Sequence, residues 1–170
     1  MYPKISLVTV VYDRELALLY LQAKSIVNNF DPEHLDSIIV VVNDSPAVVQ
    51  RIDPSWWGPL SDKVRILHNL DIGYKRTLYS GWSAQQLCKL LAATHADDWS
   101  MIWDAKSIII KEYDPSYFFD ESGRARICFR DLYTTTWPGG QARAAELFDS
   151  QDRKCLRFGP PMLDRKSTRL

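Results

Sequence analysis

Polar and charged side chains follow four apolar segments of the sequence, directly after each segment ends. The set comprises Tyr12, Asp13 and Arg14, then Asn43 and Asp44, then Asn69, Asp71 and Gly73, and finally Asp104, Ala105 and Lys106. An aromatic ring beside carboxylates and amides can stack on a nucleobase and accept hydrogen bonds from base N–H groups and sugar hydroxyls. Taken singly, the same residue types are typical of helix caps and Asx turns. Four such groups at one sheet edge give a binding pocket about the same weight as turn chemistry.

The elements that must position these side chains are strands alternating with helices. Strands are expected at 5–11, 37–42, 64–68, 99–103, 107–111 and 124–129, and helices at 14–30, 46–52, 79–94 and 141–148. Several strands are nearly continuous runs of apolar residues, which is typical of strands buried on both faces. The alternation predicts an α/β fold with a mostly parallel sheet and helices on both faces. In such sheets, ligands bind beyond the carboxyl ends of the strands.

Two local details follow from the helical patterns. Asp13 occupies the position of an N-cap for the helix over 14–30. In the helix over 79–94, the residues expected on one apolar face are Leu87, Leu90, Leu91 and Thr94.

Trp56 and Trp57 are expected to pack their loop onto the body, with stacking on a sugar ring as the alternative. The aromatic segment 113–119 is expected to pack in the core or to shape an acceptor groove.

Composition restricts the class of protein. The chain has 170 residues, 21 basic and 21 acidic, and is 46% hydrophobic, which is typical of one globular domain. An even charge balance predicts no nucleic-acid partner, since such proteins usually carry a basic face. No apolar run approaches the ~20 residues of a membrane span, and no signal peptide is expected. The cysteines, Cys88, Cys128 and Cys155, form no CxxC pair, which favours buried, reduced thiols and a cytoplasmic location.

Common catalytic motifs are missing from the sequence. There is no GxxxxGK[ST] and no GxGxxG, which argues against P-loop ATPases and dinucleotide-binding enzymes. The absence of GxSxG disfavours an α/β-hydrolase. His34, His68 and His95 are scattered without i, i+4 pairing, so a zinc site is not expected.

Four segments resemble a known family. SLVTVVYDRE, SIIVVVNDS, GWSAQQLCKL and WSMIWDAKSIIIKEYDPSYFF are similar to the N-terminal half of GT-A-type glycosyltransferases, the nucleotide-diphospho-sugar transferase superfamily, in an uncharacterised bacterial branch. The resemblance covers 5–129. Its most specific part is the Gln-Gln-Leu-x-Lys-Leu helix followed by an Asp-Ala-x strand end. It implies a Rossmann-like GT-A domain that binds a nucleoside diphosphate sugar.

The resemblance also implies which residues touch the donor. The nucleotide-binding positions would be Val10, Val11, Tyr12, Asp13, Asn43 and Asp44. Lys89 would face the pyrophosphate or line the helix surface. The family's Asp-x-Asp motif falls on Asp104, Ala105 and Lys106, so Asp104 and Lys106 would also lie at the diphosphate.

The motif departs from the family at Lys106, which replaces the second Asp. In the family, Mn²⁺ or Mg²⁺ held by the motif offsets the charge developing on the diphosphate. Three interpretations stay open. Asp104 holds a divalent cation with a ligand from elsewhere, Lys106 neutralises the diphosphate without a metal, or catalysis is lost.

The last seven residues, 164–170, differ in character from the rest and resemble the translation of a sequencing-adapter oligonucleotide. We therefore expect a single domain over 1–163, truncated at its C-terminus, with 164–170 as an artefact; the alternative is a natural basic tail. The catalytic base is unknown, because the family places it beyond the last complete strand.

The resemblance predicts a glycosyltransferase when full length, which transfers a sugar from a nucleotide donor to a glycan or other hydroxyl acceptor. Whether this chain is itself an enzyme stays open, and the alternative is a non-catalytic nucleotide- or glycan-binding module. A nucleotidyltransferase is disfavoured because residues 10–14 contain no glycine. The expected location is the cytoplasm, either free or peripheral to the inner membrane.

Overall fold

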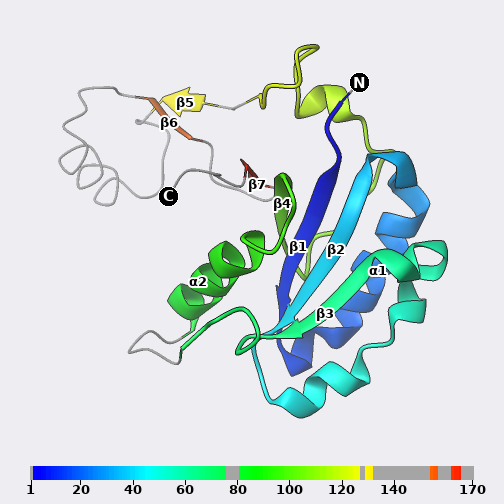
Figure 1. The fold of residues 1–170 in the computed structure, drawn as a ribbon, viewed down its shortest axis with the longest axis vertical. Helices are drawn as coiled ribbons and strands as arrows, with labels where there is room; N and C mark the ends of the chain where they lie inside the picture. Colours follow the sequence, from blue (N-terminus) through cyan, green and yellow to red (C-terminus); the bar gives the residue numbers. More distant parts are fainter. Residues whose placement is uncertain (1, 76–80, 127–128, 132–153, 157–161, 166–170) are drawn as a thin grey trace.

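A central sheet organises the computed structural model, which describes residues 2–75, 81–126, 129–131, 154–156 and 162–165. The strand order is β3-β2-β1-β4-β7 (Figure 1). The strands are β1 (Ile5–Val11), β2 (Leu35–Val42), β3 (Val64–His68), β4 (Trp99–Asp104) and β7 (Met162–Arg165). The first four run parallel to one another, and β7 is antiparallel to β4. The chain therefore has a Rossmann-like α/β fold.

The central strands are buried on both faces, as their apolar runs predict. All seven residues of β1 are buried, and so are the last five of β2. Alternate side chains point to opposite faces of a strand, so Leu7 and Val40 join one apolar cluster while Val8 and Val41 join another. The predicted bounds of β1 and β3 are confirmed, whereas β2 begins two residues earlier than expected and β4 extends to Asp104.

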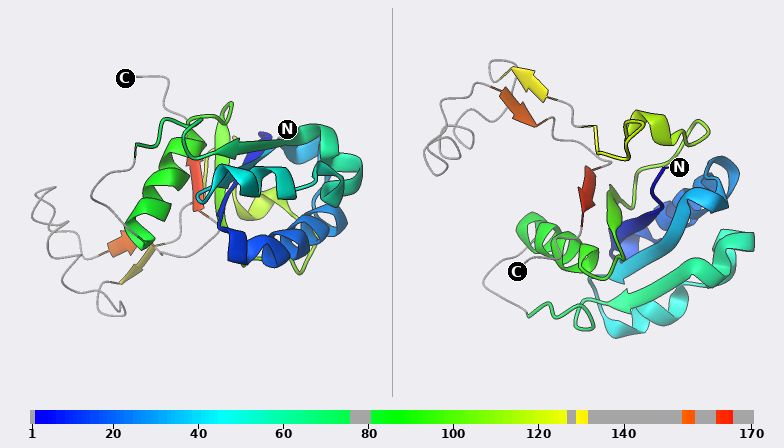
Figure 2. Two further views of the ribbon diagram at one scale, coloured as in Figure 1. Left: turned by 90° about the horizontal axis from the view of Figure 1, so that it is seen from below. Right: turned by 45° about the horizontal axis from the view of Figure 1, so that its top comes forward.

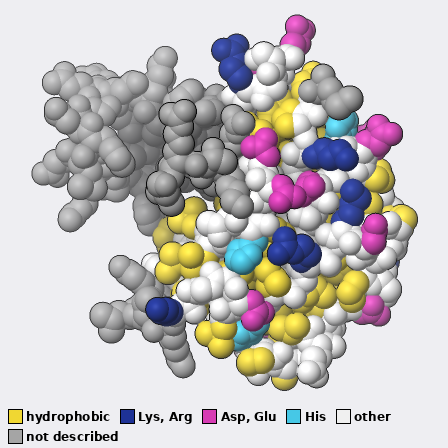
Figure 3. Space-filling model, in the orientation of Figure 1, with side chains coloured by type: hydrophobic (Ala, Val, Ile, Leu, Met, Phe, Trp, Pro, Cys, Tyr) yellow, Lys and Arg dark blue, Asp and Glu magenta, His cyan; other side chains and the backbone are white. Residues whose placement is uncertain are grey.

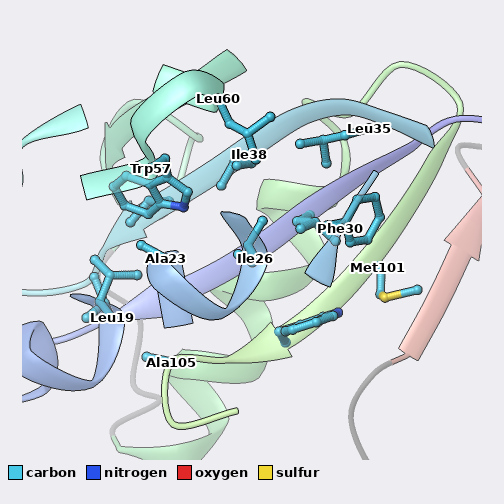
Figure 4. Close-up of a cluster of buried hydrophobic side chains, with 14 of the residues drawn as sticks. Leu19, Ala23, Ile26, Phe30, Leu35, Ile38, Trp57, Leu60, Met101 and Ala105 are labelled. Atoms are coloured by element: carbon cyan, nitrogen blue, oxygen red, sulfur yellow. The ribbon is translucent and has the colours of Figure 1, made fainter. Parts of the chain in front are cut away.

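Helix α1 (Leu16–Asn29) covers one face of the sheet. Its buried side chains lie with Trp57, Leu60 and Ile38 in a single core (Figure 4). The residues of α1 in this core are Leu16, Leu19, Ala23 and Ile26. The prediction that Asp13 caps this helix is wrong, because a 3₁₀ turn, η1 (Asp13–Glu15), precedes α1 and the N-cap residue is Glu15.

Helix α2 (Trp82–Ala93) covers the opposite face (Figure 2). It packs on the sheet through small side chains, namely Ala84, Cys88, Ala92 and Ala93. The predicted apolar face is wrong in part, because Leu90 is 59% exposed and Leu87 and Leu91 are only partly buried. Small residues let a helix approach a sheet closely, and the larger leucines then lie at its flanks.

Between these elements the chain forms short 3₁₀ helices. These are η2 (Pro32–His34), η3 (Pro46–Arg51), η4 (Pro54–Lys63) and η5 (Pro115–Tyr117). η4 contains a kink at Gly58, where φ is +51° and ψ is −119°. It forms the segment that carries the two tryptophans, and it buries Trp57 completely. The packing role expected for Trp57 is therefore confirmed.

The predicted strand at 107–111 is wrong. This segment has no strand structure, and Ile110 is 80% exposed. Side chains of α1 take the backbone hydrogen bonds that a neighbouring strand would otherwise make. Gln22 Nε2 donates to the carbonyl of Ser107 at 3.0 Å, and Asn29 Nδ2 donates to that of Ile109 at 3.0 Å.

The elements expected after residue 123 agree with the structure only in part. Ala125 makes an isolated bridge with Phe119, and β5 (Phe129–Asp131) pairs with β6 (Lys154–Leu156) in a separate two-stranded sheet. Within the expected strand at 124–129, the described residues form the bridge at Ala125 and the start of β5 at Phe129, and 127–128 lie outside the described residues. The expected helix at 141–148 lies outside the described residues. The expected domain boundary at 163 falls within β7.

The aromatic segment after β4 packs in the core in part, since Tyr113 and Phe119 are buried whereas Tyr117 is 79% exposed. Tyr113 stacks on Phe30 and on Phe118, with ring centroids 4.1 Å and 5.6 Å apart. Burial raises the pKa of Tyr113 well above its usual value, with a smaller contribution from Asp114.

Across 2–75 and 81–126, the helices are too short or too polar to cross a membrane. Acidic and basic side chains are interspersed on the face shown in Figure 3, in keeping with the even charge balance.

Candidate functional site

The carboxyl ends of the four parallel strands meet at one edge of the sheet. In the register of the sheet, Val10 lies beside Asp104 and Val11 lies beside Val42, which in turn lies beside His68. The segments that leave β1, β2, β3 and β4 therefore emerge as neighbours. This is the edge at which parallel sheets bind their ligands.

Val10 and Val11 contribute backbone only. Both side chains are completely buried, one in each of the two cores. The carbonyl of Val11 accepts a hydrogen bond from the N–H of Asn43 at 2.9 Å. These residues thus fix the direction in which Tyr12 and Asn43 leave the sheet.

Three polar side chains form a row across the ends of β1, β2 and β3. Asn43 Nδ2 donates to the Tyr12 hydroxyl at 2.9 Å, and Asn69 Nδ2 donates to Asn43 Oδ1 at 2.8 Å. Burial raises the pKa of Tyr12, and the hydrogen bond from Asn43 partly opposes that shift. Asn69 Oδ1 is buried without a hydrogen-bond partner among the described residues. Position after the third strand was the sequence signal for Asn69, although it was not among the predicted nucleotide ligands.

Beside this row lies an open, charged pocket of about 550 Å³. Its lining residues are Tyr12, Asp13, Arg14, Asp44 and Arg51. Asp13 forms an ion pair with Arg51, and its backbone N–H donates to Asp44 Oδ2 at 3.1 Å. Backbone N–H groups of Asp13 and Ser45 hold the pKa of Asp44 below its usual value. Arg51 belongs to η3, and its basic side chain was not predicted as part of the site.

A second cluster occupies the end of β4. Lys89, from α2, forms an ion pair with Asp104 Oδ1, and Lys106 Nζ lies 3.9 Å from Asp104 Oδ2. Lys89 is only 7% exposed, so it points inward from α2 instead of lining the helix surface. The Lys106 side chain is 72% exposed. The structure thus brings together all three residues expected at a diphosphate.

Gln22 of α1 positions this cluster. Its side chain is buried, and Nε2 donates to the carbonyls of Asp104 and Ser107 at 2.8 Å and 3.0 Å. The turn after β4 is further closed by the Ser107 N–H, which donates to the Asp104 carbonyl at 2.9 Å. Sequence reasoning missed Gln22, although a glutamine on the apolar face of a helix was the available signal.

The donor set around Asp104 does not fit Mn²⁺ or Mg²⁺. Hard divalent cations need several oxygen ligands, and both Asp104 oxygens face lysine ammonium groups. The charges next to Asp104 are those that attract an anion.

A third feature adjoins the charged pocket and shares Arg51 with it. This open pocket of about 510 Å³ is mostly apolar. It is lined by Leu16, Ala17, Tyr20, Leu21, Arg51 and Trp56. Tyr20 and Trp56 meet edge to face, with ring centroids 5.6 Å apart. Trp56 therefore faces a pocket, unlike the buried Trp57.

Comparison with family models and with curated proteins finds no match for this chain.

Proposed function

We propose that this chain binds a nucleoside diphosphate sugar at the carboxyl edge of its parallel sheet, as the donor site of a GT-A-type glycosyltransferase. The single observation that carries the proposal is the placement of two different clusters at one edge. The Tyr12–Asn43–Asn69 row suits a nucleoside, and the Lys89–Asp104–Lys106 cluster suits a diphosphate.

The nucleoside half of the proposal depends on hydrogen-bonding capacity. Because Asn43 donates to the Tyr12 hydroxyl, that hydroxyl keeps its own proton for a second bond. The buried Asn69 Oδ1 is an acceptor that a base N–H or a sugar hydroxyl would satisfy. Asp44, which is exposed beside Tyr12, offers carboxylate oxygens to ribose hydroxyls.

The diphosphate half depends on charge. When the sugar is transferred, the bond from the anomeric carbon to the diphosphate oxygen breaks and negative charge develops on the leaving group. Ammonium groups such as those of Lys89 and Lys106 stabilise that charge through charge-assisted hydrogen bonds. The acceptor hydroxyl must lose its proton to a general base, and we assign that role to none of the described residues.

The apolar pocket beside Arg51 supports a glycan acceptor. Aromatic rings such as Tyr20 and Trp56 offer flat apolar faces on which a sugar ring can lie, with polar groups at their edges. Its position next to the charged pocket would bring an acceptor hydroxyl near a bound donor.

One observation favours a second candidate, a non-catalytic module that binds a nucleotide or a glycan. Lys106 stands where the family has a second metal-binding carboxylate, and Asp104 is already paired with Lys89. A chain that has lost the metal would keep binding without turnover.

Titration calorimetry with the full chain separates these candidates. UDP, GDP, CDP, ADP and inorganic pyrophosphate would be titrated first, and nucleoside diphosphate release from the matching sugar nucleotides would follow. Tight binding of one nucleoside diphosphate with release supports the transferase, and binding without release supports the module. If no nucleoside diphosphate binds more tightly than pyrophosphate, the chain has no nucleotide site, which contradicts both the transferase and a nucleotide-binding module.

Asn43→Ala tests the nucleoside half directly. It removes two hydrogen bonds from the row, so we expect about tenfold weaker binding of the preferred nucleoside diphosphate. Binding of pyrophosphate should stay unchanged, because Asn43 does not reach the lysine cluster. Asn28→Ala, at an exposed position of α1, is the matched control.

A further inference from the structure

Asp104 lies between two ammonium groups that come from different elements. Lys89 reaches it from α2, and Lys106 reaches it from the turn that follows β4. The two lysines approach different oxygens of the carboxylate, Oδ1 and Oδ2. The cluster as a whole therefore carries one net positive charge.

Of the two lysines, Lys89 depends more strongly on the negative charge of Asp104, because it is the buried one. Lys89 is 7% exposed and is one of the buried residues of α2. A buried ammonium group is stable in its charged form only beside a counter-charge and hydrogen-bond acceptors. Asp104 supplies both, and its own position is fixed by the hydrogen bond from Gln22 to its carbonyl.

A metal ion at Asp104 would have to displace these lysines or lie next to them. Repulsion between like charges is strong at such separations in a partly buried site. A diphosphate, in contrast, would meet the exposed ammonium group of Lys106 from the solvent side. The same two lysines that exclude a cation attract the anion.

We infer that Asp104 is the internal counter-ion of a metal-independent diphosphate site, and that Lys89 and Lys106 are the groups that neutralise the diphosphate. This inference rests on the proposed function, since it specifies how the donor site handles the charge of its ligand. Asp104 positions Lys89 and competes with the diphosphate for both lysines.

The inference and a metal site predict opposite effects of one substitution. Asp104→Asn keeps an oxygen that accepts from Lys89 but removes the competing negative charge. If Asp104 is a counter-ion, Asp104→Asn leaves Lys89 without a counter-charge until a diphosphate binds and supplies one, so metal-free affinity for a diphosphate should rise by about threefold to tenfold. If Asp104 holds a metal, the same substitution should abolish metal-dependent binding.

Lys106→Met is the second variant, and its exposed position leaves the fold intact. Loss of one charge-assisted hydrogen bond should weaken diphosphate binding by about tenfold. Matched controls are Lys111→Met and Asp97→Asn, which change exposed residues away from this cluster. Asp97 precedes β4, at the opposite end of the strand from Asp104.

The experiment is calorimetric titration of the full chain and these variants with inorganic pyrophosphate and with nucleoside diphosphates, in EDTA and in Mn²⁺. Circular dichroism verifies that each variant is folded. We expect binding in EDTA, tighter binding by Asp104→Asn, weaker binding by Lys106→Met and no change in the controls. If Asp104→Asn does not fold, the test depends on Lys106→Met. Pyrophosphate binding in EDTA that is as tight in this variant as in the unmodified chain overturns the inference.

The outcomes separate this inference from the proposed function. Nucleoside diphosphate binding that requires Mn²⁺ overturns the inference and leaves the donor site standing. Metal-free binding of pyrophosphate without any gain from a nucleoside supports the lysine site and overturns the nucleotide proposal. Absence of binding by both probes, with and without Mn²⁺, overturns both.

Discussion

Two neighbouring residues of α2 show how burial acts on single groups. Cys88 and Lys89 are both buried, at 0% and 7% exposure. Burial without a counter-charge raises the pKa of the Cys88 thiol to about 11, so the thiol stays neutral. Lys89 instead lies against Asp104. At the residue scale, the neighbour of a buried group determines whether that group stays neutral, as Cys88 does, or joins an ion pair, as Lys89 does.

Cys88 should therefore resist alkylation in the folded chain. The thiolate is the reactive form, and raising the thiol pKa from 9.0 to about 11 lowers the thiolate fraction near neutral pH. Such a shift slows labelling about 100-fold relative to the unfolded chain. The same shift makes stability fall as pH rises from 9.0 towards about 11, since only the unfolded thiol then ionises.

Iodoacetamide labelling followed by peptide mass spectrometry measures the rate at Cys88 in buffer and in concentrated urea. Equal rates in the two conditions would contradict the buried, neutral thiol.

At the scale of elements, α1 serves as a scaffold for the segment after β4. Gln22, Ser25 and Asn29 lie along one side of the helix and bind backbone groups of residues 104–109. Each of these bonds satisfies a group that would otherwise need a neighbouring strand. The helix thus fixes both the irregular segment and the orientation of Asp104.

Replacing Gln22 with Leu should loosen this segment. The substitution leaves two carbonyls without their donor, and we expect a loss of about 2 kcal/mol or more of unfolding free energy. Urea unfolding followed by tryptophan fluorescence measures the loss. Gln50→Leu, at an exposed position of η3, is the control, and equal midpoints for the two variants would argue against the scaffold role.

The kink of η4 should depend on a glycine. Gly58 has positive φ, and nothing lies within 4 Å of the position where a Cβ would be added. Gly58→Ala therefore tests backbone strain without a steric clash, and we expect a cost of about 1–3 kcal/mol. Thermal unfolding measures it, and an unchanged midpoint would mean that the backbone relaxes to an ordinary conformation.

Strands and helices could be predicted from sequence where the local pattern of apolar residues is enough to determine the element. β1 is a short run rich in β-branched residues and β3 is a short segment with Val64, Ile66 and Leu67, and the bounds of both were predicted correctly. The run at 107–111 is also rich in β-branched residues, but its backbone carbonyls accept hydrogen bonds from side chains of α1, which the sequence does not display as a pattern. The contact face of α2 was missed because its alanines and Cys88 give a weaker periodic signal than its leucines.

The residues of the candidate site likewise fall into those that could be predicted from sequence and those that could not. Tyr12, Asn43 and Asp104 follow strands directly, so their shared edge could be predicted from strand ends alone. Arg51 and Gln22 come from helices whose rotation against the sheet is set by core packing, and this information is not local in the sequence.

For the whole molecule, the two edges of the sheet differ. β3 is a parallel edge strand, whereas the other edge is formed by β7, which runs antiparallel to the buried strand β4. An uncovered apolar strand is a template for pairing with another chain. β7 therefore protects the strand that carries Asp104.

Removing residues 162–170 should expose that edge and promote self-association. Removing only 166–170 retains β7 and serves as the control. Size-exclusion chromatography with light scattering measures association, and hydrogen exchange measures protection of the β4 amides. A monomer with protected β4 amides after the longer deletion would contradict this role of β7.

The partly buried ion pair of Lys89 and Asp104 has a consequence for how this protein could evolve or be engineered. Removing two charges from water costs free energy that a well-packed apolar pair would not. The double change Lys89→Met with Asp104→Leu is therefore expected to raise thermal stability while eliminating anion binding. Selection for heat resistance alone would erase the site, so retention of the pair under such selection would itself indicate that the chain is under pressure to bind its ligand.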